Sequence, residues 1–213
     1  MYTLYAFATP NSIKVPIALE ELGLAYELNL VNVRKGEQKE QAFLSINPNG
    51  KVPILVDPDG PDGAPLTLTE SAAILIYLAE KTGRLLASKG AGRARVFEQL
   101  FFHASGLGPA LGQAGFFKRN DEKLPLAINR FDAEAKRTLR VLDGVLAQSR
   151  FVAGEDLTIA DIAHFGWLWR REFAGIDFGG TPHVQRWYQT MENRPAIVRA
   201  IERVNKAVAD QAA

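Results

Sequence analysis

The sequence predicts a fold of the α/β plus all-α class, with a small mixed domain followed by an all-helical one. Residues 1–82 alternate strand and helix patterns, separated by dense turn residues. From about Arg84 the strand patterns stop, and apolar residues recur at three- and four-residue steps, which is typical of amphipathic helices. We therefore expect domains over residues 1–82 and 91–213, joined by a linker over 83–90.

The first domain begins with a βαβ pattern. Residues 2–7 are aromatic, β-branched and apolar, which predicts a buried strand. The turn at residues 9–12 leads into a helix that runs to about Leu22, where a glycine follows. Alternating residues over 26–33 predict a second strand.

A hairpin and a further helix complete this domain. After a turn at residues 47–50, residues 52–56 predict a buried strand. The segment 57–63 is rich in turn residues and connects that strand to another over residues 66–69. A helix opens at Glu70-Ser71, so the order predicts a small mixed sheet covered by helices.

The second domain carries helix-start signals as well as apolar periodicity. Thr158–Asp161 has the S/T-x-x-D pattern of a capping box, and Thr181-Pro182 suits an N-cap followed by proline at the first helical position. The apolar positions of its two clearest helical faces are Ile128, Phe131, Ala135, Leu139, Leu142 and Leu146, and Ile197, Ile201, Val204 and Val208.

The composition excludes several classes of function. The chain has no cysteine, which rules out disulfides, thiolate metal sites, iron–sulfur clusters and a thiol nucleophile of its own. Lysine and arginine total 25 against 24 aspartate and glutamate, so we expect neither nucleic acid nor a membrane surface as partner. With three widely spaced histidines we expect no metal site. Because no signal pattern or membrane span stands out, we expect a cytoplasmic protein.

Three features of the first domain predict one binding site. The turn at residues 9–12 precedes a helix, whose N-terminus attracts anions. Val52-Pro53 suggests an exposed backbone edge that could pair with an extended peptide. Glu70 and Ser71 could meet a ligand ammonium and carboxylate. Taken separately, these features are better explained by helix capping and an ordinary edge strand. Together they predict a peptide-like ligand with a thiol or oxyanion at one end.

These motifs resemble those of glutathione transferases, over nearly the whole chain. The Thr-Pro-Asn turn and the segment Gly106–Pro109 narrow the resemblance to the nu class, a bacterial group that includes glutathione-dependent disulfide-bond reductases. The matching segments are Thr9-Pro10-Asn11, Lys35-Gly36-Glu37-Gln38, Asn47-Pro48-Asn49-Gly50-Lys51-Val52-Pro53, Thr69-Glu70-Ser71 and Leu157-Thr158-Ile159-Ala160-Asp161.

The resemblance implies a thioredoxin-like first domain that binds glutathione as a substrate. Val52 would pair with the cysteinyl backbone of glutathione, beside a cis Pro53. Glu70 and Ser71 would hold the γ-glutamyl end. Gln38 and Lys51 would lie near the glycyl end of glutathione.

The same resemblance places Thr9 and Asn11 beside the glutathione sulfur. A free thiol has a pKa of about 8.5, so hydrogen-bond donors and a helix dipole that favour the thiolate raise its reactive fraction. Ser12 is an alternative source of the activating hydroxyl, or a helix cap. Arg130 matches a glutathione-contacting arginine on the long helix after the linker; a solvated helix face is the alternative interpretation.

Three residues of the second domain are candidates for the site of the acceptor substrate. His103 lies among aromatic residues on a predicted helix, where a core position is the alternative. Phe116 and Phe117 follow a glycine in a loop-like stretch and could form a wall of the acceptor site or belong to the core.

Taken together, the sequence predicts a homodimeric enzyme that activates the thiol of glutathione. The leading hypothesis is reduction of small disulfides, in which the sulfur chemistry runs on glutathione. Conjugation of glutathione to electrophiles, or peroxide reduction, would use the same thiolate. A further alternative is a non-catalytic binding protein with the glutathione transferase fold.

Overall fold

A computed structural model describes residues 1–212, with side chains through Gln211. The chain forms two compact units: residues 1–84 together with the segment from Asn193 onward, and residues 85–192. No helix of the described residues combines the length and the apolar character that crossing a membrane requires.

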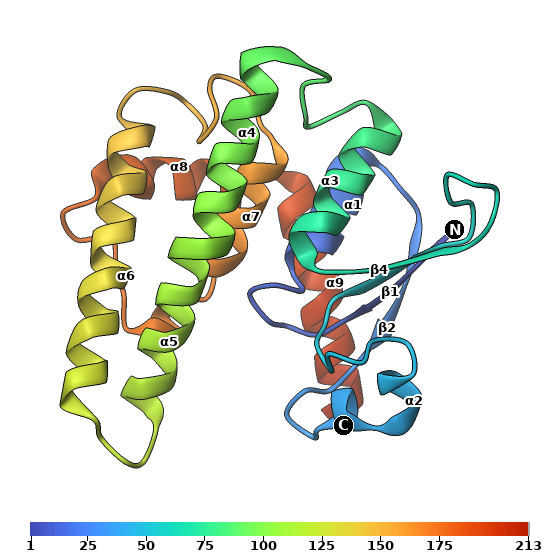
Figure 1. The fold of residues 1–213 in the computed structure, drawn as a ribbon, viewed down its shortest axis with the longest axis horizontal. Coiled ribbons are helices and arrows are strands. Elements are labelled where there is room, and N and C mark those ends of the chain that lie inside the picture. The colour runs from blue at the N-terminus through green and yellow to red at the C-terminus, as the bar shows by residue number, and fades with distance from the viewer. Residues whose placement is uncertain (213) are drawn as a thin grey trace. The chain divides into compact units, whose positions relative to one another are not determined.

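The first unit is built on a four-stranded mixed sheet with the order β2-β1-β3-β4 (Figure 1). β1 pairs in parallel with β2, whereas β1 with β3 and β3 with β4 are antiparallel. This topology confirms the predicted βαβ pattern followed by a hairpin. The strands are β1 (Tyr2–Ala6), β2 (Tyr26–Leu30), β3 (Ile54–Asp57) and β4 (Leu66–Thr69).

Two helices of this unit pack against each other and contribute many of its buried apolar side chains. α1 (Lys14–Leu22) connects the parallel strands, and α3 (Ser71–Thr82) follows β4. Gly23 ends α1 as expected, because its φ of 70° suits glycine and its N–H bonds to the last carbonyls of the helix. Between β2 and β3 lie a 3-10 turn, η1 (Glu37–Lys39), and the short helix α2 (Gln41–Leu44).

The last helix, α9 (Pro195–Ala212), belongs with the first unit rather than with the helices that precede it. It packs on α1 and β2. Arg194 forms a two-pronged ion pair with Glu21, with N–O distances of 2.6 and 2.9 Å, and Arg203 donates to the Tyr26 carbonyl at 2.7 Å. The sequence-based boundary, which kept residues 91–213 together, therefore differs from the observed units.

The second unit is entirely helical. α4 continues into α5 through a π-helical turn, η2, and α6 packs on both α5 and α8. The elements are α4 (Gly90–Phe102), η2 (His103–Leu107), α5 (Gly108–Arg119), α6 (Pro125–Leu146), α7 (Ile159–Leu168), the 3-10 turn η3 (Arg171–Ala174) and α8 (Pro182–Glu192).

The capping box predicted at Thr158–Asp161 is present and lies at the start of α7. The Asp161 carboxylate accepts hydrogen bonds from the N–H and the hydroxyl of Thr158, each at 2.9 Å. It also accepts from Val152 N at 2.9 Å and from Trp187 Nε1 at 3.0 Å. One local motif therefore joins three parts of this unit around a helix that is buried at every position but Trp167.

The structure corrects the prediction that Phe116 and Phe117 follow Gly115 in a loop. All three lie in α5, which runs to Arg119. Position 115 of this helix requires glycine, because a Cβ there would lie about 2.1 Å from an atom of the Phe173 ring. The glycine therefore marks a close helix contact and not a turn.

Candidate functional site

Three chain segments meet at one end of the sheet because of the strand directions. Tyr5 pairs with Ile54, and Ile54 pairs with Thr69. β1 runs toward this end and leaves it at the Thr9 turn. β3 is antiparallel to β1, so it begins here, directly after Pro53. β4 ends here and passes into Glu70 and α3. The sheet thus brings together the turn, the proline and the helix start that the sequence predicted to share a site.

The turn after β1 is closed by its own hydroxyl groups. The Thr9 hydroxyl donates to Ser12 Oγ at 3.0 Å, and the Ser12 N–H donates to Thr9 Oγ1 at 3.3 Å. Ser12 is fully buried, Thr9 is half-buried and Asn11 is exposed. Of the two possible hydroxyls, that of Thr9 is therefore the more accessible.

Neither Asn11 nor Ser12 caps α1, contrary to the capping alternative. The residue before the helix is Ile13, which already has a helical backbone conformation and provides no side-chain cap. Asn11 instead accepts a hydrogen bond on its Oδ1 atom from Lys14 Nζ at 2.8 Å. Its carboxamide is therefore used in a side-chain network at the edge of the sheet.

Lys14 is a residue of this network that sequence reasoning missed. Its side chain is only 3% exposed, and besides Asn11 its Nζ contacts Ser71 Oγ at a longer 3.4 Å. Burial lowers the pKa of Lys14 to about 7, while the negative charge of Glu70 opposes this shift. The available signal was that Lys14 is the one polar residue within the apolar run 13–19.

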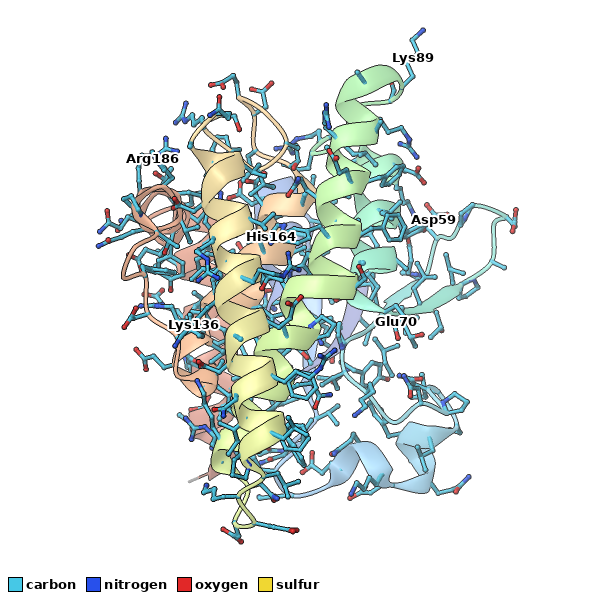
Figure 2. All side chains as sticks on the ribbon, turned by 60° about the vertical axis from the view of Figure 1, so that its left-hand side comes forward. Asp59, Glu70, Lys89, Lys136, His164 and Arg186 are labelled. Carbon is cyan, nitrogen blue, oxygen red and sulfur yellow. The ribbon has the colours of Figure 1, made fainter. Side chains whose placement is uncertain are left out.

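The start of α3 presents Glu70 and Ser71 with an unusual backbone. Figure 2 shows Glu70 where β4 passes into α3. Its φ is 66°, a conformation that is uncommon outside glycine and that costs free energy. The Glu70 carboxylate is exposed, whereas Ser71 is buried as the first residue of the helix. Strain of this kind concentrates at functional sites, which favours the binding interpretation over simple capping.

The peptide bond between Val52 and Pro53 is cis, as the resemblance implied. Pro53 is buried. Val52 is partly buried against a cluster that contains Val31, Phe43 and Ile54. Because the pairing of β3 begins at Ile54, Val52 lies outside the ladder at the same end of the sheet as Thr9 and Glu70. Its backbone is therefore placed where an extended ligand could add to the sheet edge.

The loop before Pro53 lies against the backbone of Gln38. Buried Asn47 holds this loop, because its Nδ2 donates to the Lys51 carbonyl at 2.7 Å and its Oδ1 accepts from Asn49 N at 3.1 Å. Gly50, at a φ of 62°, approaches so closely that a Cβ there would lie 3.3 Å from the Gln38 carbonyl oxygen. Lys51 is exposed, and Gln38 Oε1 is buried without a hydrogen-bond partner among the described residues.

Two of the predicted residues of the second unit are in contact: the rings of Phe116 and Phe117 lie 5.2 Å apart. Arg130 is exposed on α6. His103 is buried in the π-helical turn, with its ring 5.0 Å from that of His164, which favours the core alternative. Phe116 is 56% exposed on α5. Phe117 stacks on Phe131 at 5.4 Å, which indicates a packing role.

The site at the end of the sheet is suited to a zwitterionic, peptide-like ligand. Lys14 and the N-terminal end of α3 provide positive potential for an anion near Asn11 or Ser71. The exposed Glu70 carboxylate offers a partner for an ammonium group. Among the described residues, no cluster of three or more histidine, aspartate or glutamate side chains could hold a metal ion.

Two family models match this chain. The one described as "Glutathione S-transferase, N-terminal domain" matches residues 8–81. The one described as "Glutathione S-transferase, C-terminal domain" matches residues 113–195. A curated relative, the disulfide-bond oxidoreductase YfcG of Escherichia coli (strain K12), is 42% identical over 205 residues, which is 94% of this chain and 94% of the relative.

Two solved structures with bound glutathione species are also similar. A glutathione transferase family member from Pseudomonas fluorescens pf-5, with two glutathione bound, has a TM-score of 0.89 and 41% identity, covering 94% of this chain and 92% of that one. A glutathione transferase from Pseudomonas putida, with one glutathione disulfide bound per subunit, has a TM-score of 0.85 and 40% identity. The match covers 94% of this chain and 90% of that one.

Proposed function

Because the chain belongs to the glutathione S-transferase family, we propose that it is an enzyme that reduces small disulfides with glutathione. The observation that carries the proposal is the meeting of the Thr9–Asn11 turn, the cis Val52-Pro53 bond and the Glu70-Ser71 pair at one end of the sheet. The names of the similar proteins support the reaction: one is a disulfide-bond oxidoreductase, and two others are seen with two glutathione molecules or with glutathione disulfide.

In this proposal each part of glutathione has a place in the first unit. The backbone of Val52 pairs with the cysteinyl residue of glutathione. Glu70 binds the γ-glutamyl ammonium, and the Ser71 hydroxyl binds the carboxylate at the start of α3. The glycyl carboxylate lies near Lys51 and the Gln38 carboxamide.

The sulfur then lies beside the Thr9–Asn11 turn. The thiolate is a hydrogen-bond acceptor only, so donors at this point favour it over the thiol and lower its pKa. The Asn11 carboxamide supplies such a donor. The Thr9 hydroxyl has one proton, which goes to Ser12 in this structure, so Thr9 must rotate to donate to sulfur. We therefore assign the larger share of thiolate stabilisation to Asn11.

Two glutathione molecules balance the reaction. The first thiolate attacks one sulfur of the substrate disulfide, the S–S bond breaks, and the other sulfur leaves as a thiolate that takes up a proton. The second glutathione, as thiolate, attacks the glutathione sulfur of the mixed disulfide. This step forms glutathione disulfide and releases the second substrate thiol. No cysteine of the protein takes part, because the chain has none.

The finer assignments are part of the same proposal. We assign the protein to the nu class on its Thr-Pro-Asn turn, with Arg130 as a further glutathione contact. Of the three acceptor candidates we keep only the exposed Phe116, because His103 and Phe117 pack against other rings. We expect a homodimer, which light scattering coupled to size-exclusion chromatography measures. We expect it to act in the cytoplasm, because the reaction needs a pool of reduced glutathione.

The test compares three acceptors with one purified protein. Glutathione is supplied together with hydroxyethyl disulfide, an aryl halide or an organic hydroperoxide, and product formation is followed for each. We expect the disulfide to be reduced fastest. Asn11→Ala should lower kcat/KM by about tenfold to a hundredfold, because a donor to a charged group is lost. Asn205→Ala, which changes an exposed asparagine on α9, is the matched control.

The outcomes separate the three hypotheses. Background disulfide reduction beside rapid aryl halide or hydroperoxide turnover would replace the reductase with a conjugating or peroxide-reducing enzyme. If no reaction occurs and calorimetry detects no glutathione binding, the chain is a non-catalytic member of the family. A normal rate for Asn11→Ala would refute the assignment of Asn11 while leaving the reaction class intact.

A further inference from the structure

Lys14 lies between the two ends of the proposed glutathione site. Its Nζ atom is 2.8 Å from Asn11 Oδ1 and 3.4 Å from Ser71 Oγ. Asn11 belongs to the turn after β1, whereas Ser71 is the first residue of α3, 57 positions later in the sequence than Lys14. One ammonium group therefore contacts both the side chain assigned to the sulfur and the side chain assigned to the γ-glutamyl carboxylate.

The burial of Lys14 is unfavourable for the fold. Ile13, which precedes α1, and Val15 and Ile17 within it are all fully buried core residues. Lysine is almost never buried to this extent, because removing an ammonium from water is costly and hydrogen bonds compensate only part of that cost. An apolar side chain of similar length would fill the same space without this penalty. Stability alone therefore does not account for a lysine at this position.

The chemistry of the ammonium determines how its two partners are oriented. Lys14 Nζ donates to Asn11 Oδ1, so the atom of Asn11 that faces the amine is the carbonyl oxygen. The amide nitrogen of Asn11, with its two N–H donors, then points to the other side, and Asn11 is exposed. In the same way, Ser71 Oγ accepts from Lys14, so its own proton is directed elsewhere.

Both consequences match what the ligand requires. A thiolate and a carboxylate are acceptors only, and each needs a donor. Lys14 turns the donor end of Asn11 and the hydroxyl proton of Ser71 away from itself. Without this N–H donor, the Asn11 carboxamide could rotate by half a turn and present its oxygen to the sulfur, which would repel a thiolate.

We propose that Lys14 is a positioning residue that orients Asn11 and Ser71 as hydrogen-bond donors and so links recognition of the γ-glutamyl carboxylate to activation of the glutathione thiol. The inference rests on the proposed glutathione function. Lys14 does not touch the reacting atoms; it acts through the two side chains that do.

The test replaces Lys14 by methionine, which keeps the length of the side chain and removes the donor. Lys81→Met is the matched control, because Lys81 belongs to the same unit and pairs with Asp57 at 2.6 Å, apart from the proposed site. Circular dichroism and thermal unfolding first establish that both variants fold. Glutathione binding is then measured by calorimetry, bound thiolate by its ultraviolet absorbance, and disulfide reduction by kcat and KM.

For Lys14→Met we expect a fall of about tenfold or more in both glutathione affinity and kcat, with a smaller thiolate fraction at saturating glutathione. Lys81→Met should change none of these three quantities. A loss confined to affinity, with kcat and thiolate fraction unchanged, would refute the link to the sulfur. A Lys14→Met protein that behaves as the wild type would refute the whole proposal.

A double-variant cycle separates positioning from a direct role. If Lys14 acts through Asn11, the variant with both Lys14→Met and Asn11→Ala should show at most about a twofold further loss of thiolate fraction relative to Asn11→Ala alone. Fully multiplicative losses would mean that Lys14 acts independently, which overturns the proposal. Lys14→Met with Ser71→Ala gives the same comparison for glutathione affinity.

The proposed function and the positioning role can fail separately. If the wild type binds glutathione but reduces no disulfide, the reductase proposal fails, while affinity and thiolate absorbance still decide the role of Lys14. If the wild type binds no glutathione, both proposals are refuted. Failure of Lys14→Met to fold would contradict the premise that burial of this lysine is unfavourable. In that case Ser71→Ala, Asn11→Ala and the variant with both changes still show whether carboxylate binding and thiol activation depend on each other.

Discussion

In each unit of this protein a charged side chain lies buried at the start of a helix, Lys14 in the first and Asp161 in the second, and the two have opposite surroundings. In the second unit, the fully buried Asp161 carboxylate accepts from two backbone N–H groups, a hydroxyl and an indole. In the first unit, the Lys14 ammonium contacts the side chains of Asn11 and Ser71. Burial shifts both against the charged form: it raises the pKa of Asp161 and lowers that of Lys14.

The identity of the partners distinguishes a structural charge from a functional one. The partners of Asp161 are groups of its own unit that would otherwise be buried without acceptors, so the carboxylate and its donors stabilise each other. Lys14 contacts Asn11 and Ser71, two polar side chains at the end of the sheet, where the proposed ligand binds. A buried charge of the first kind holds elements together, whereas one of the second kind orients groups toward a ligand.

The largest effect should come from removing Asp161. Asp161→Ala leaves two N–H groups, a hydroxyl and an indole N–H without their acceptor, and should lower the free energy of unfolding by about 3 kcal/mol or more. Asp143→Ala, which removes the acceptor for two N–H groups of α8, is the control and should cost about 1–2 kcal/mol. Denaturant titration measures the free energy of unfolding of both variants. Equal losses would show that Asp161 contributes no more to stability than Asp143.

Replacing Lys14 by an uncharged residue should instead raise the free energy of unfolding near neutral pH. The Lys14 pKa is about 7 in the folded protein against an ordinary 10.5, with Glu70 the charged group that opposes the shift. Between those values the unfolded chain binds the proton and the folded one does not, so the wild type gains stability as pH rises, by up to about 1.4 kcal/mol per pH unit.

Lys14→Met lacks this titration. Relative to the wild type, it should therefore be more stable at about pH 7.5, and its advantage should shrink by about 2 kcal/mol at about pH 9. Urea denaturation at the two pH values measures the change, with Lys81→Met as the reference variant. A difference between variant and wild type that does not depend on pH would mean that Lys14 remains charged in the folded protein.

Glu70 allows backbone strain to be separated from binding. Glu70→Gly and Glu70→Ala both remove the carboxylate and should raise the KM for glutathione by about tenfold. Glycine adopts the observed φ of 66° freely and alanine does not, so Glu70→Gly should be the more stable variant by about 1 kcal/mol. Thermal unfolding and steady-state kinetics test the pair. Unchanged KM values would assign Glu70 to the fold rather than to the ligand.

The smallest effect is an expected absence of change. Treatment with iodoacetamide, followed by removal of the reagent, should leave the glutathione-dependent disulfide reduction rate unaltered, because the chain has no thiol to alkylate. A thioredoxin treated in parallel loses its activity and serves as the control. Inactivation of this protein would point to a reactive group other than cysteine in the site.

The agreement between sequence and structure is best where a signal spans a few residues. The Thr158–Asp161 box and the helix end at Gly23 formed as predicted, because their hydrogen bonds close within one turn of the chain. The order of strands and helices also followed from local periodicity. The helical setting of Phe116 was not predicted, because Gly115 resembles a turn signal in the sequence and only its close contact with the Phe173 ring explains a glycine inside the helix. The π-helical turn at His103 has no local motif in the sequence.

By itself, the sequence determined the mixed fold of the first unit, the helical second unit and the absence of a cysteine for redox chemistry. It also identified the motif residues that the sheet brings together. Only the tertiary structure decided that Lys14 lies buried beneath Asn11 and Ser71, and that α9 joins the first unit through Glu21 and Tyr26. Hydrogen bonds within a turn depend on neighbouring residues, whereas the burial of a single lysine depends on which helix faces meet across the fold.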